Sequence, residues 1–341
     1  MTLQSSGTIR WSDIRDEFGA NINNTEVSLG RYRNTSSAFS HKDVGDMTDL
    51  PLDIGVPKSG TIKASDFYSK KLNVVVDLHS QPNNTTRQDI RGRWNSNNVQ
   101  VIGGYRGRPS SGSNVRVIAH INKTIGSEVG GTKRCAVRTG SWESNTSLEI
   151  DVGSSGKVYG AGGDGGNGGG PTGAGNPASD GSSALGITYP CTIDNGGRIQ
   201  SGYGGGGGGG GARYWIKSGK KSGGWHGSTG GGGGAGAGYP NGNGGNSPTN
   251  AYGSGSNGSD GGDGGNESSG NGGAGGNSAG AGGAGATVNN TSDWGAIGGG
   301  GSHGSGGGGR NGYAIITSQG SLPSISGNAV VGRTLTNTNP D

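Results

Sequence analysis

A threefold recurrence of glycine is the feature that most constrains the fold of this chain. Residues 160 to 312 hold 64 of its 84 glycines and only seven Val, Ile, Leu, Met or Phe residues. Between Gly258 and Ala286, glycine leads every triplet except those at Glu267 and Ala279. Such a region cannot close a core of side chains, so any order in it must come from its backbone.

Three backbone arrangements are compatible with so much glycine. A flexible tether needs no register, and a collagen triple helix needs an unbroken triplet and more proline than the 11 residues of this chain. A bundle of polyglycine II helices has three residues per turn, which places one row of bare Cα atoms where neighbouring backbones approach. The register favours such a bundle over residues 160–320. It also predicts Glu267 and Ala279 at bends or on an exposed side.

Between Leu72 and Tyr159, apolar residues recur with a period of two. The segments LNVVVDLHS, NVRVIAHIN and SLEIDV carry β-branched residues and are separated by polar turns. Short strands with no helical period between them predict an antiparallel β domain over residues 72–159. The chain as a whole is therefore expected to be mostly β and irregular.

An internal repeat marks residues 1–71 as a separate module. SGTIRWSDI from Ser6 to Ile14 returns as SGTIKASDF from Ser59 to Phe67. In both copies the Ser-Asp pair is expected at the N-cap of a short helix. A module this small gains stability by docking or by oligomerising. The residues expected to take part in attachment are Trp11, Ile14, Phe18 and Phe67.

Aromatic side chains in the loops between glycine runs are the candidates for recognition. Aromatic residues on adaptable loops suit binding and can stack on sugar rings. Trp215 and Trp294 are also candidates for capping the ends of the bundle, whereas Trp225 and Tyr239 are better candidates for an exposed contact. The candidate residues for binding a partner are Trp215, Trp225, His226, Tyr239 and Tyr252.

Catalytic and metal-binding patterns were not found in the sequence. The five histidines lack metal-ligand spacing, and no glycine run ends in a phosphate-binding GKS or GKT. SDGGDGGN lacks the apolar residue of a calcium-binding β-roll, so Asp260 and Asp263 are expected to be solvated surface carboxylates. Cys135 and Cys191 have no CxxC partner and are expected to be free thiols. We therefore expect no enzyme activity, cofactor or metal.

The charge and the apolar runs exclude two further classes. The net charge of +4 is not gathered into a dense basic face, so a nucleic-acid partner is not expected. No stretch has the length of an apolar membrane span or the pattern of a secretory signal. We expect a chain that is made in the cytoplasm and does not insert into a membrane.

Two stretches resemble known phage proteins. SGTIRWSDIRDEFG with EVSLGRYR and PKSGTIKASDFY is similar to the N-terminal module of virion and tail-fibre proteins of marine tailed phages, including those of cyanobacteria. The opening IDNGGRIQSGYGGGGGGGG and the closing NGYAIITS resemble tail-fibre adhesins in which polyglycine II helices carry receptor specificity in their end loops. The resemblance implies a homotrimeric virion protein that attaches to tail or baseplate proteins and binds a host glycan or outer-membrane protein.

The last stretch resembles a different kind of domain. LPSISGNAVVGRTLTNTNPD is similar to the start of a bacterial immunoglobulin-like repeat, so residues 321–341 are expected to be a linker or such a start, and the natural protein is expected to continue past Asp341. Two alternative functions stay open. One is a virion structural or decoration protein without a receptor role, and the other is an ice-binding glycine bundle.

Overall fold

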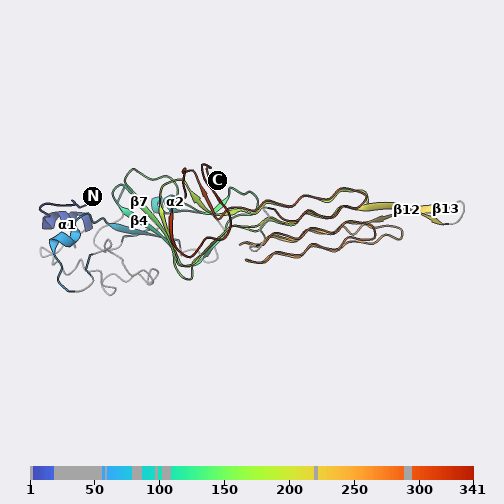
Figure 1. Ribbon diagram of the computed structural model, residues 1–341, viewed down its shortest axis with the longest axis horizontal. Helices are drawn as coiled ribbons and strands as arrows, with labels where there is room; N and C mark the ends of the chain where they lie inside the picture. The colour runs from blue at the N-terminus through green and yellow to red at the C-terminus, as the bar shows by residue number, and fades with distance from the viewer. Residues whose placement is uncertain are drawn as a thin grey trace.

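The protein is elongated, with a small N-terminal module at one end, a β domain in the middle and long glycine-rich segments beyond it (Figure 1). This computed structural model describes residues 3–18, 56–57, 60–78, 87–96, 99–101, 109–218, 222–287 and 294–341. Strands outnumber helices in these ranges, which confirms the mostly β prediction.

Parallel strands build the β domain. One sheet has the order β15 (Ser324–Gly327), β10 (Thr192–Asn195), β7 (Ser147–Val152), β4 (Arg116–Ile121), β1 (Asn73–Asp77) and β3 (Val99–Val101). A second sheet has the order β16 (Thr334–Leu335), β14 (Ile315–Thr317), β9 (Ser183–Ile187), β6 (Cys135–Arg138) and β2 (Gln88–Asp89). A third contains β11 (Arg198–Gln200), β8 (Lys157–Tyr159) and β5 (Thr124–Ile125).

The chain visits the three sheets in turn, so that it winds as a coil. It passes through β4, β5 and β6, then through β7, β8 and β9, and then through β10, β11 and β14. The register stacks Ala119 on Ile150 and Ile150 on Ile193 in successive coils. These side chains belong to one apolar cluster in which they are almost fully buried. Each buried Ile contributes about 1.5–3 kcal/mol, so this stack helps to hold successive coils of the β domain together.

The prediction of an antiparallel β domain is wrong. Only β1 and β3 pair antiparallel in this sheet, whereas β1, β4, β7, β10 and β15 pair in parallel. Each of these strands pairs with the strand one coil later, and the two other faces supply the crossover that parallel pairing requires. Residues 321–341 also differ from the expected linker or immunoglobulin-like start, because they too belong to the parallel sheets. Their strands β15 and β16 pair in parallel with β10 and β14, so they extend the coil instead of opening an immunoglobulin-like repeat.

The repeated motif of the N-terminal module forms two similar helix starts. Helix α1 spans Trp11–Phe18, and the short 3-10 helix η2 spans Ala64–Phe67. Asp13 Oδ2 accepts a hydrogen bond from the Arg10 nitrogen at 2.8 Å, and Asp66 Oδ2 accepts one from the Lys63 nitrogen at 2.7 Å. The aspartates are thus the third helical residues, which reach back to the residue before the helix. The expectation that Ser-Asp forms the N-cap itself is corrected.

Apolar side chains of this module are buried within the chain. Ile14, Phe18 and Phe67 are at most 1% exposed and share the apolar cluster of the β domain. They are therefore not available to a virion partner, because short helices bury their apolar face on the adjacent coil instead of keeping it for docking. Trp11 is 50% exposed and is the one of the four expected attachment residues that a partner can reach.

Helix α2 (Ile90–Asn95) packs its buried residues Ile90 and Trp94 into the apolar cluster of the β domain. Asp89 is its N-cap and accepts from the Gly92 nitrogen at 2.8 Å. Its buried Trp94 lies edge-on to Trp142, with ring centroids 5.4 Å apart.

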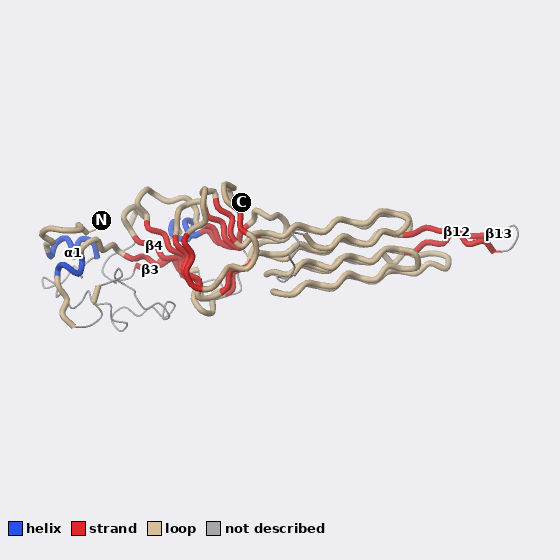
Figure 2. The backbone as a smooth tube through the Cα atoms, in the orientation of Figure 1, coloured by secondary structure: helices blue, strands red, loops and turns tan. Residues whose placement is uncertain are grey.

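Glycine-rich segments leave the coil at two points and run side by side (Figure 2). The first excursion lies between β8 and β9, and the second between β11 and β14. In the described residues the segments are 160–170, 173–182, 201–211, 229–238, 242–248, 256–265, 268–277, 279–287, 294–301 and 304–312. We call 204–211 and 230–238 the two central segments.

The first central segment is bonded on every side. Its amide nitrogens donate with a period of three to three different neighbours, and its carbonyl oxygens accept from three others. The donor and acceptor pairs are Gly205 with Ser179, Gly206 with Gly234, Gly207 with Ala296, Gly208 with Asn176, Gly209 with Gly231 and Gly210 with Gly299. In the other direction, the amide nitrogens of Gly166, Gly283 and Gly306 donate to the carbonyl oxygens of Gly206, Gly207 and Gly208, respectively. The segment therefore has six neighbours.

Packing explains why this segment consists of glycine alone. A Cβ atom at any residue from Gly204 to Gly211 would lie 1.8 to 2.2 Å from a backbone oxygen of a neighbour. Outer segments have an exposed row, and a Cβ at Gly300, Gly304 or Gly307 would meet nothing within 4 Å. A threefold glycine pattern is thus enough at the periphery, whereas the first central segment requires glycine at every position, and the second also holds the buried residues Ala235 and Ala237.

The two breaks in the register lie where the chain turns, as predicted. Glu267 is exposed and lies at a bend with Asn266. The Ala279 nitrogen donates to the Gly276 oxygen at 2.9 Å across a turn in which Ser278 has a φ of 62°. The three segments that flank these breaks, 256–265, 268–277 and 279–287, keep their hydrogen bonds to neighbouring segments.

Side chains replace missing neighbours on the outside of the bundle. Asp164 Oδ1 accepts from the Asn243 nitrogen at 2.8 Å, and Asn167 Oδ1 accepts from the Asn246 nitrogen at 2.8 Å. From the other side, Asp263 Oδ1 accepts from the Gly244 nitrogen at 2.8 Å, and Asp260 Oδ1 accepts from the Ser247 nitrogen at 2.6 Å. Asp260 and Asp263 are therefore structural acceptors as well as exposed carboxylates, which corrects the expectation that they are only solvated.

Candidate functional site

A β-hairpin forms the far end of the bundle. Strands β12 (Ala212–Ser218) and β13 (Ser222–Ser228) connect the two central segments and extend beyond them (Figure 1). Trp215 pairs with Trp225 and Tyr214 pairs with His226 across the hairpin. Because successive side chains of a strand point to opposite faces, the hairpin presents one aromatic pair on each face.

The tryptophan face carries the two most exposed aromatic rings of the hairpin. Trp215 is 52% exposed and Trp225 is 50% exposed, with ring centroids 5.3 Å apart and planes at 74°. The Arg213 guanidinium lies 4.3 Å from the centroid of Trp225. A Cβ at Gly223 would lie 2.5 Å from the Trp215 indole nitrogen, so this glycine lets the indole lie against the neighbouring strand.

The opposite face is anchored to a neighbouring turn. Tyr214 and His226 stack with ring centroids 5.8 Å apart and planes at 19°. The Ser254 hydroxyl lies 2.9 Å from His226 Nδ1, and the Ser254 backbone nitrogen also donates to this ring nitrogen. This face is therefore held by the turn and is less open than the tryptophan face.

Tyr252 fixes the base of the hairpin. Its nitrogen and oxygen both bond to Gly227, with each donor-acceptor distance 3.0 Å. The Tyr252 ring and Pro171 flank this glycine so closely that a Cβ there would lie 2.5 Å from each. Tyr252 is 38% exposed, so it extends the aromatic surface while it sets the direction of the hairpin.

The structure brings together four of the five receptor candidates predicted from sequence. Trp215, Trp225, His226 and Tyr252 lie at the hairpin. Tyr239 lies at the other end of the bundle, where its oxygen accepts from the Ser127 nitrogen at 3.3 Å and where it is half-buried.

The two candidates for capping the ends of the bundle, Trp215 and Trp294, also lie at opposite ends of it. Trp294 lies at the same end as Tyr239 and stacks with Arg310 at 5.1 Å, whereas Trp215 projects from the far end. Sequence reasoning missed Arg213 and Tyr214. The alternation in ARYWIK, which places Arg213, Trp215 and Lys217 on one face of a strand, could have indicated them.

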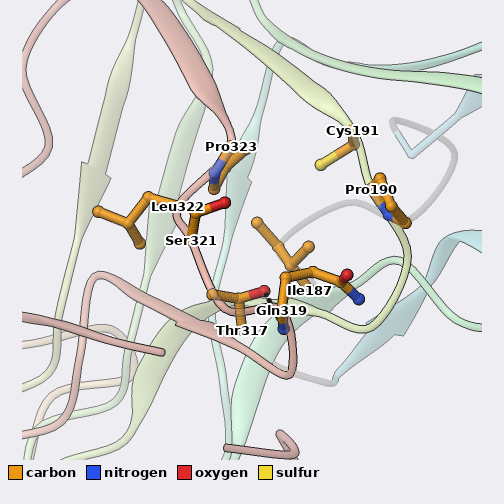
Figure 3. Close-up of a pocket in the computed structure, with 8 residues that line it drawn as sticks. All are labelled: Ile187, Pro190, Cys191, Thr317, Gln319, Ser321, Leu322 and Pro323. Carbon is orange, nitrogen blue, oxygen red and sulfur yellow. Dashed lines mark hydrogen bonds between the residues drawn. The ribbon is translucent and has the colours of Figure 1, made fainter. Parts of the chain in front are cut away.

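A pocket of about 180 Å³ lies in the last coils, between the turn after β9 and the turn after β14. Figure 3 shows its lining residues, with the Cys191 side chain directed into the space that they surround. Burial raises the pKa of the Cys191 thiol to about 12, so the thiol is protonated near neutral pH and is a poor nucleophile. None of the lining residues is charged, which leaves the pocket without acid or base chemistry. The lining residues are Ile187, Pro190, Cys191, Thr317, Gln319, Ser321, Leu322 and Pro323.

The described part of the chain contains neither a cluster of metal ligands nor a membrane-spanning helix. Within those ranges no three His, Cys, Asp or Glu side chains lie close enough to hold a metal ion. No helix there combines the length and the apolar character needed to cross a membrane.

Comparison with known proteins identifies the family. No curated protein and no solved structure matches the chain. The model of the family described as phage tail fibre adhesin Gp38 matches residues 80–338, which is most of the chain. This range includes the coiled β domain from β2 onward, all described glycine-rich segments and the hairpin, and it supports a receptor-binding role in the tail fibre of a virion. The N-terminal stretch that resembles marine phage proteins lies outside it. This chain therefore belongs to the phage tail fibre adhesin Gp38 family.

Proposed function

We propose that the chain attaches to the phage tail through its N-terminal end and contacts the host receptor with the hairpin at the opposite end. One observation carries the proposal. Trp215 and Trp225 are exposed on the hairpin, with the exposed Tyr252 at its base, and the hairpin forms the end of the molecule opposite the N-terminal module (Figure 1). An exposed aromatic cluster at the far tip of an adhesin is the surface that first meets a cell.

In this proposal the glycine-rich segments are polyglycine II helices that form a rigid strut. The period of three in their hydrogen bonds supports this assignment, as does the bonding of the first central segment to six neighbours. A backbone that is bonded on all sides cannot bend without losing several bonds at once. A rigid strut holds the hairpin ready for binding, which lowers the ordering cost of association.

At the N-terminal end, Trp11 lies on α1 and is half-exposed, and it is our candidate for a contact with another tail or baseplate protein. The homotrimer implied by the resemblance stays a prediction, which sedimentation of the purified chain can test. Several copies on one virion would strengthen weak receptor contacts through multivalency.

Adsorption of the purified full chain to a panel of bacterial strains tests the receptor role. The test variant replaces residues 213–227 by Asn-Gly, which joins Ala212 to Ser228, two residues that face each other in the hairpin. We expect adsorption to fall at least about tenfold, because hot-spot aromatic residues dominate binding energy. The matched control is Trp294→Ala, which removes an exposed tryptophan with a stacked arginine at the other end of the bundle.

The outcomes separate the receptor role from a role in virion structure alone. Adsorption that is unchanged without the hairpin would contradict the proposed site. Absence of adsorption to every strain by the unaltered chain would favour a decoration protein without a receptor role. Trp11→Ala is expected to reduce incorporation into virions while adsorption of the isolated chain stays the same.

A further inference from the structure

We propose that the tryptophan face of the hairpin binds a negatively charged saccharide of the host cell surface. This inference rests on the proposed receptor role of the hairpin and names the chemical class of the receptor. It is carried by the charge of the tip and by the geometry of Trp215, Trp225 and Arg213.

Charge at the tip has one sign. The described residues of the hairpin, 212–218 and 222–228, include Arg213 and Lys217 but no Asp or Glu. The described carboxylates of the bundle lie along its flanks or near the β domain, where they bond to backbone nitrogens or to arginines. They are Asp164, Asp180, Asp260, Asp263 and Glu267. The field at the tip therefore favours an anionic partner.

Two flat rings at the tip are arranged for stacking. Trp215 lies over Gly223, which has no side chain to cover or tilt the indole. Trp225 stands at 74° to it, so the pair forms a corner with about half of each ring open to solvent. Indole rings are amphipathic and rigid, and they contact the apolar face of a sugar ring at low cost in conformational entropy.

Arg213 places a cation beside these rings. Its guanidinium lies 4.3 Å from the Trp225 centroid, and its backbone nitrogen donates to the Ser302 hydroxyl at 2.8 Å. A stacked guanidinium keeps the donors on its edge for a carboxylate or phosphate, which it binds in a bidentate manner. A sugar stacked on Trp215 or Trp225 would therefore bring its acidic group to Arg213.

The size of the surface favours a saccharide over a protein. A stable protein interface buries about 800 Å² on each partner. The hairpin is two strands wide, and its tyrosine face is held by the turn at Ser254, so the open part is one narrow face. Two aromatic rings with Arg213 and Lys217 on such a face match one or two charged sugars.

Adsorption to treated cells of a strain that the chain binds separates the two receptor classes. Periodate oxidation of the cells destroys sugar rings, and protease treatment removes exposed protein loops. We expect periodate to abolish adsorption and protease to leave it intact. Loss of adsorption after protease but not after periodate would overturn the inference while it leaves the receptor role of the hairpin standing. The inference would also be overturned if neither treatment reduced adsorption of the parent chain while variants of the hairpin still failed to adsorb.

Charge is tested on defined probes with the full chain. Surface saccharide is purified from the same strain and immobilised before and after chemical removal of phosphate and reduction of carboxyl groups. Binding is expected to fall at least about tenfold on the neutralised saccharide and to weaken between 50 and 500 mM salt, because exposed charge pairs are screened. Equal binding to both preparations would contradict the anionic class.

Variants connect the binding to the named residues. Trp215→Ala and Arg213→Gln should each weaken binding to the untreated saccharide about tenfold or more, whereas Trp294→Ala should not change it. Arg213→Lys keeps the charge but loses the planar stack and is expected to bind at an intermediate level. Circular dichroism melting of each variant checks that the bundle is folded. Unchanged binding in both Trp215→Ala and Arg213→Gln would place the saccharide elsewhere.

Discussion

The amide nitrogen of Gly209 lies 2.8 Å from the carbonyl oxygen of Gly231, at the contact between the two central segments. No side chain separates the two backbones at this contact, and the two central segments carry no side chains except the buried methyl groups of Ala235 and Ala237. Each such hydrogen bond contributes about 0.5–1.5 kcal/mol net. The bundle is therefore stable through the number of its bonds, and any atom that holds two segments apart breaks several of them together.

Adding one methyl group in the centre should destabilise the bundle. In Gly209→Ala the new Cβ would lie 2.0 Å from the Gly280 oxygen, which belongs to a rigid backbone. We expect the free energy of unfolding to fall by at least about 1–3 kcal/mol, as for overpacked cores. Guanidinium titration followed by circular dichroism measures this change.

The matched control for this change is Gly300→Ala on an outer segment. Its Cβ would meet nothing within 4 Å, and loss of glycine from the unfolded chain should stabilise the protein by about 0.4–1 kcal/mol. Equal effects of the two substitutions would contradict the packing described for the central segment.

Removal of a bridging carboxylate should loosen the outside of the bundle. In Asp263→Ala the Gly244 nitrogen loses its acceptor, which costs about 1 kcal/mol. Asp263→Asn keeps an oxygen acceptor, as Asn167 does for Asn246 on the opposite side, and should stay close to the parent. Amide hydrogen exchange at Gly244 is the direct measurement. Equal exchange in the alanine and asparagine variants would mean that the bond has no structural role.

The threefold register and its breaks could be predicted because they are local. Glu267 and Ala279 interrupt a period that any neighbour of the segment requires, and the structure places both at turns. Parallel pairing of the strands could not be predicted in the same way. β8 and β9 belong to one coil but are separated by an excursion of the chain, and β11 and β14 are separated by a longer one. Partners in the sheets are therefore distant in sequence.

The candidate site was predictable in composition but not in position. Trp225 and Tyr239 both stand between glycine runs, and the sequence around them is equally rich in glycine and polar residues. The distance between Trp225 and Tyr239 depends on which end of the bundle the chain has reached at each of these residues. The central segment after β13 returns toward the β domain, so Tyr239 at its end lies near Ser127 and away from the hairpin.

A buried glutamate should tie the N-terminal module to the first coil. Glu17 is 2% exposed, and its Oε1 accepts from the Leu72 nitrogen at 2.9 Å, directly before β1. In Glu17→Ala this buried nitrogen has no acceptor from the helix, which should cost about 1–3 kcal/mol. Glu17→Gln retains a carbonyl oxygen and should lose less. Limited proteolysis of the module compares them, and equal cleavage of the two variants and the parent would refute the link.

Alkaline pH should destabilise the β domain through its buried thiols. Burial raises the pKa of Cys135 to about 12, whereas an unfolded cysteine has a pKa near 8.5. Above about pH 9 the unfolded chain releases a proton that the folded chain retains. Stability is therefore fully present below that pH and falls toward pH 12, with a slope approaching about 1.4 kcal/mol per pH unit for each thiol. Cys135→Ala should flatten this decline in urea titrations between pH 9 and 11. An identical slope in the variant would show that the thiol does not titrate as its burial requires.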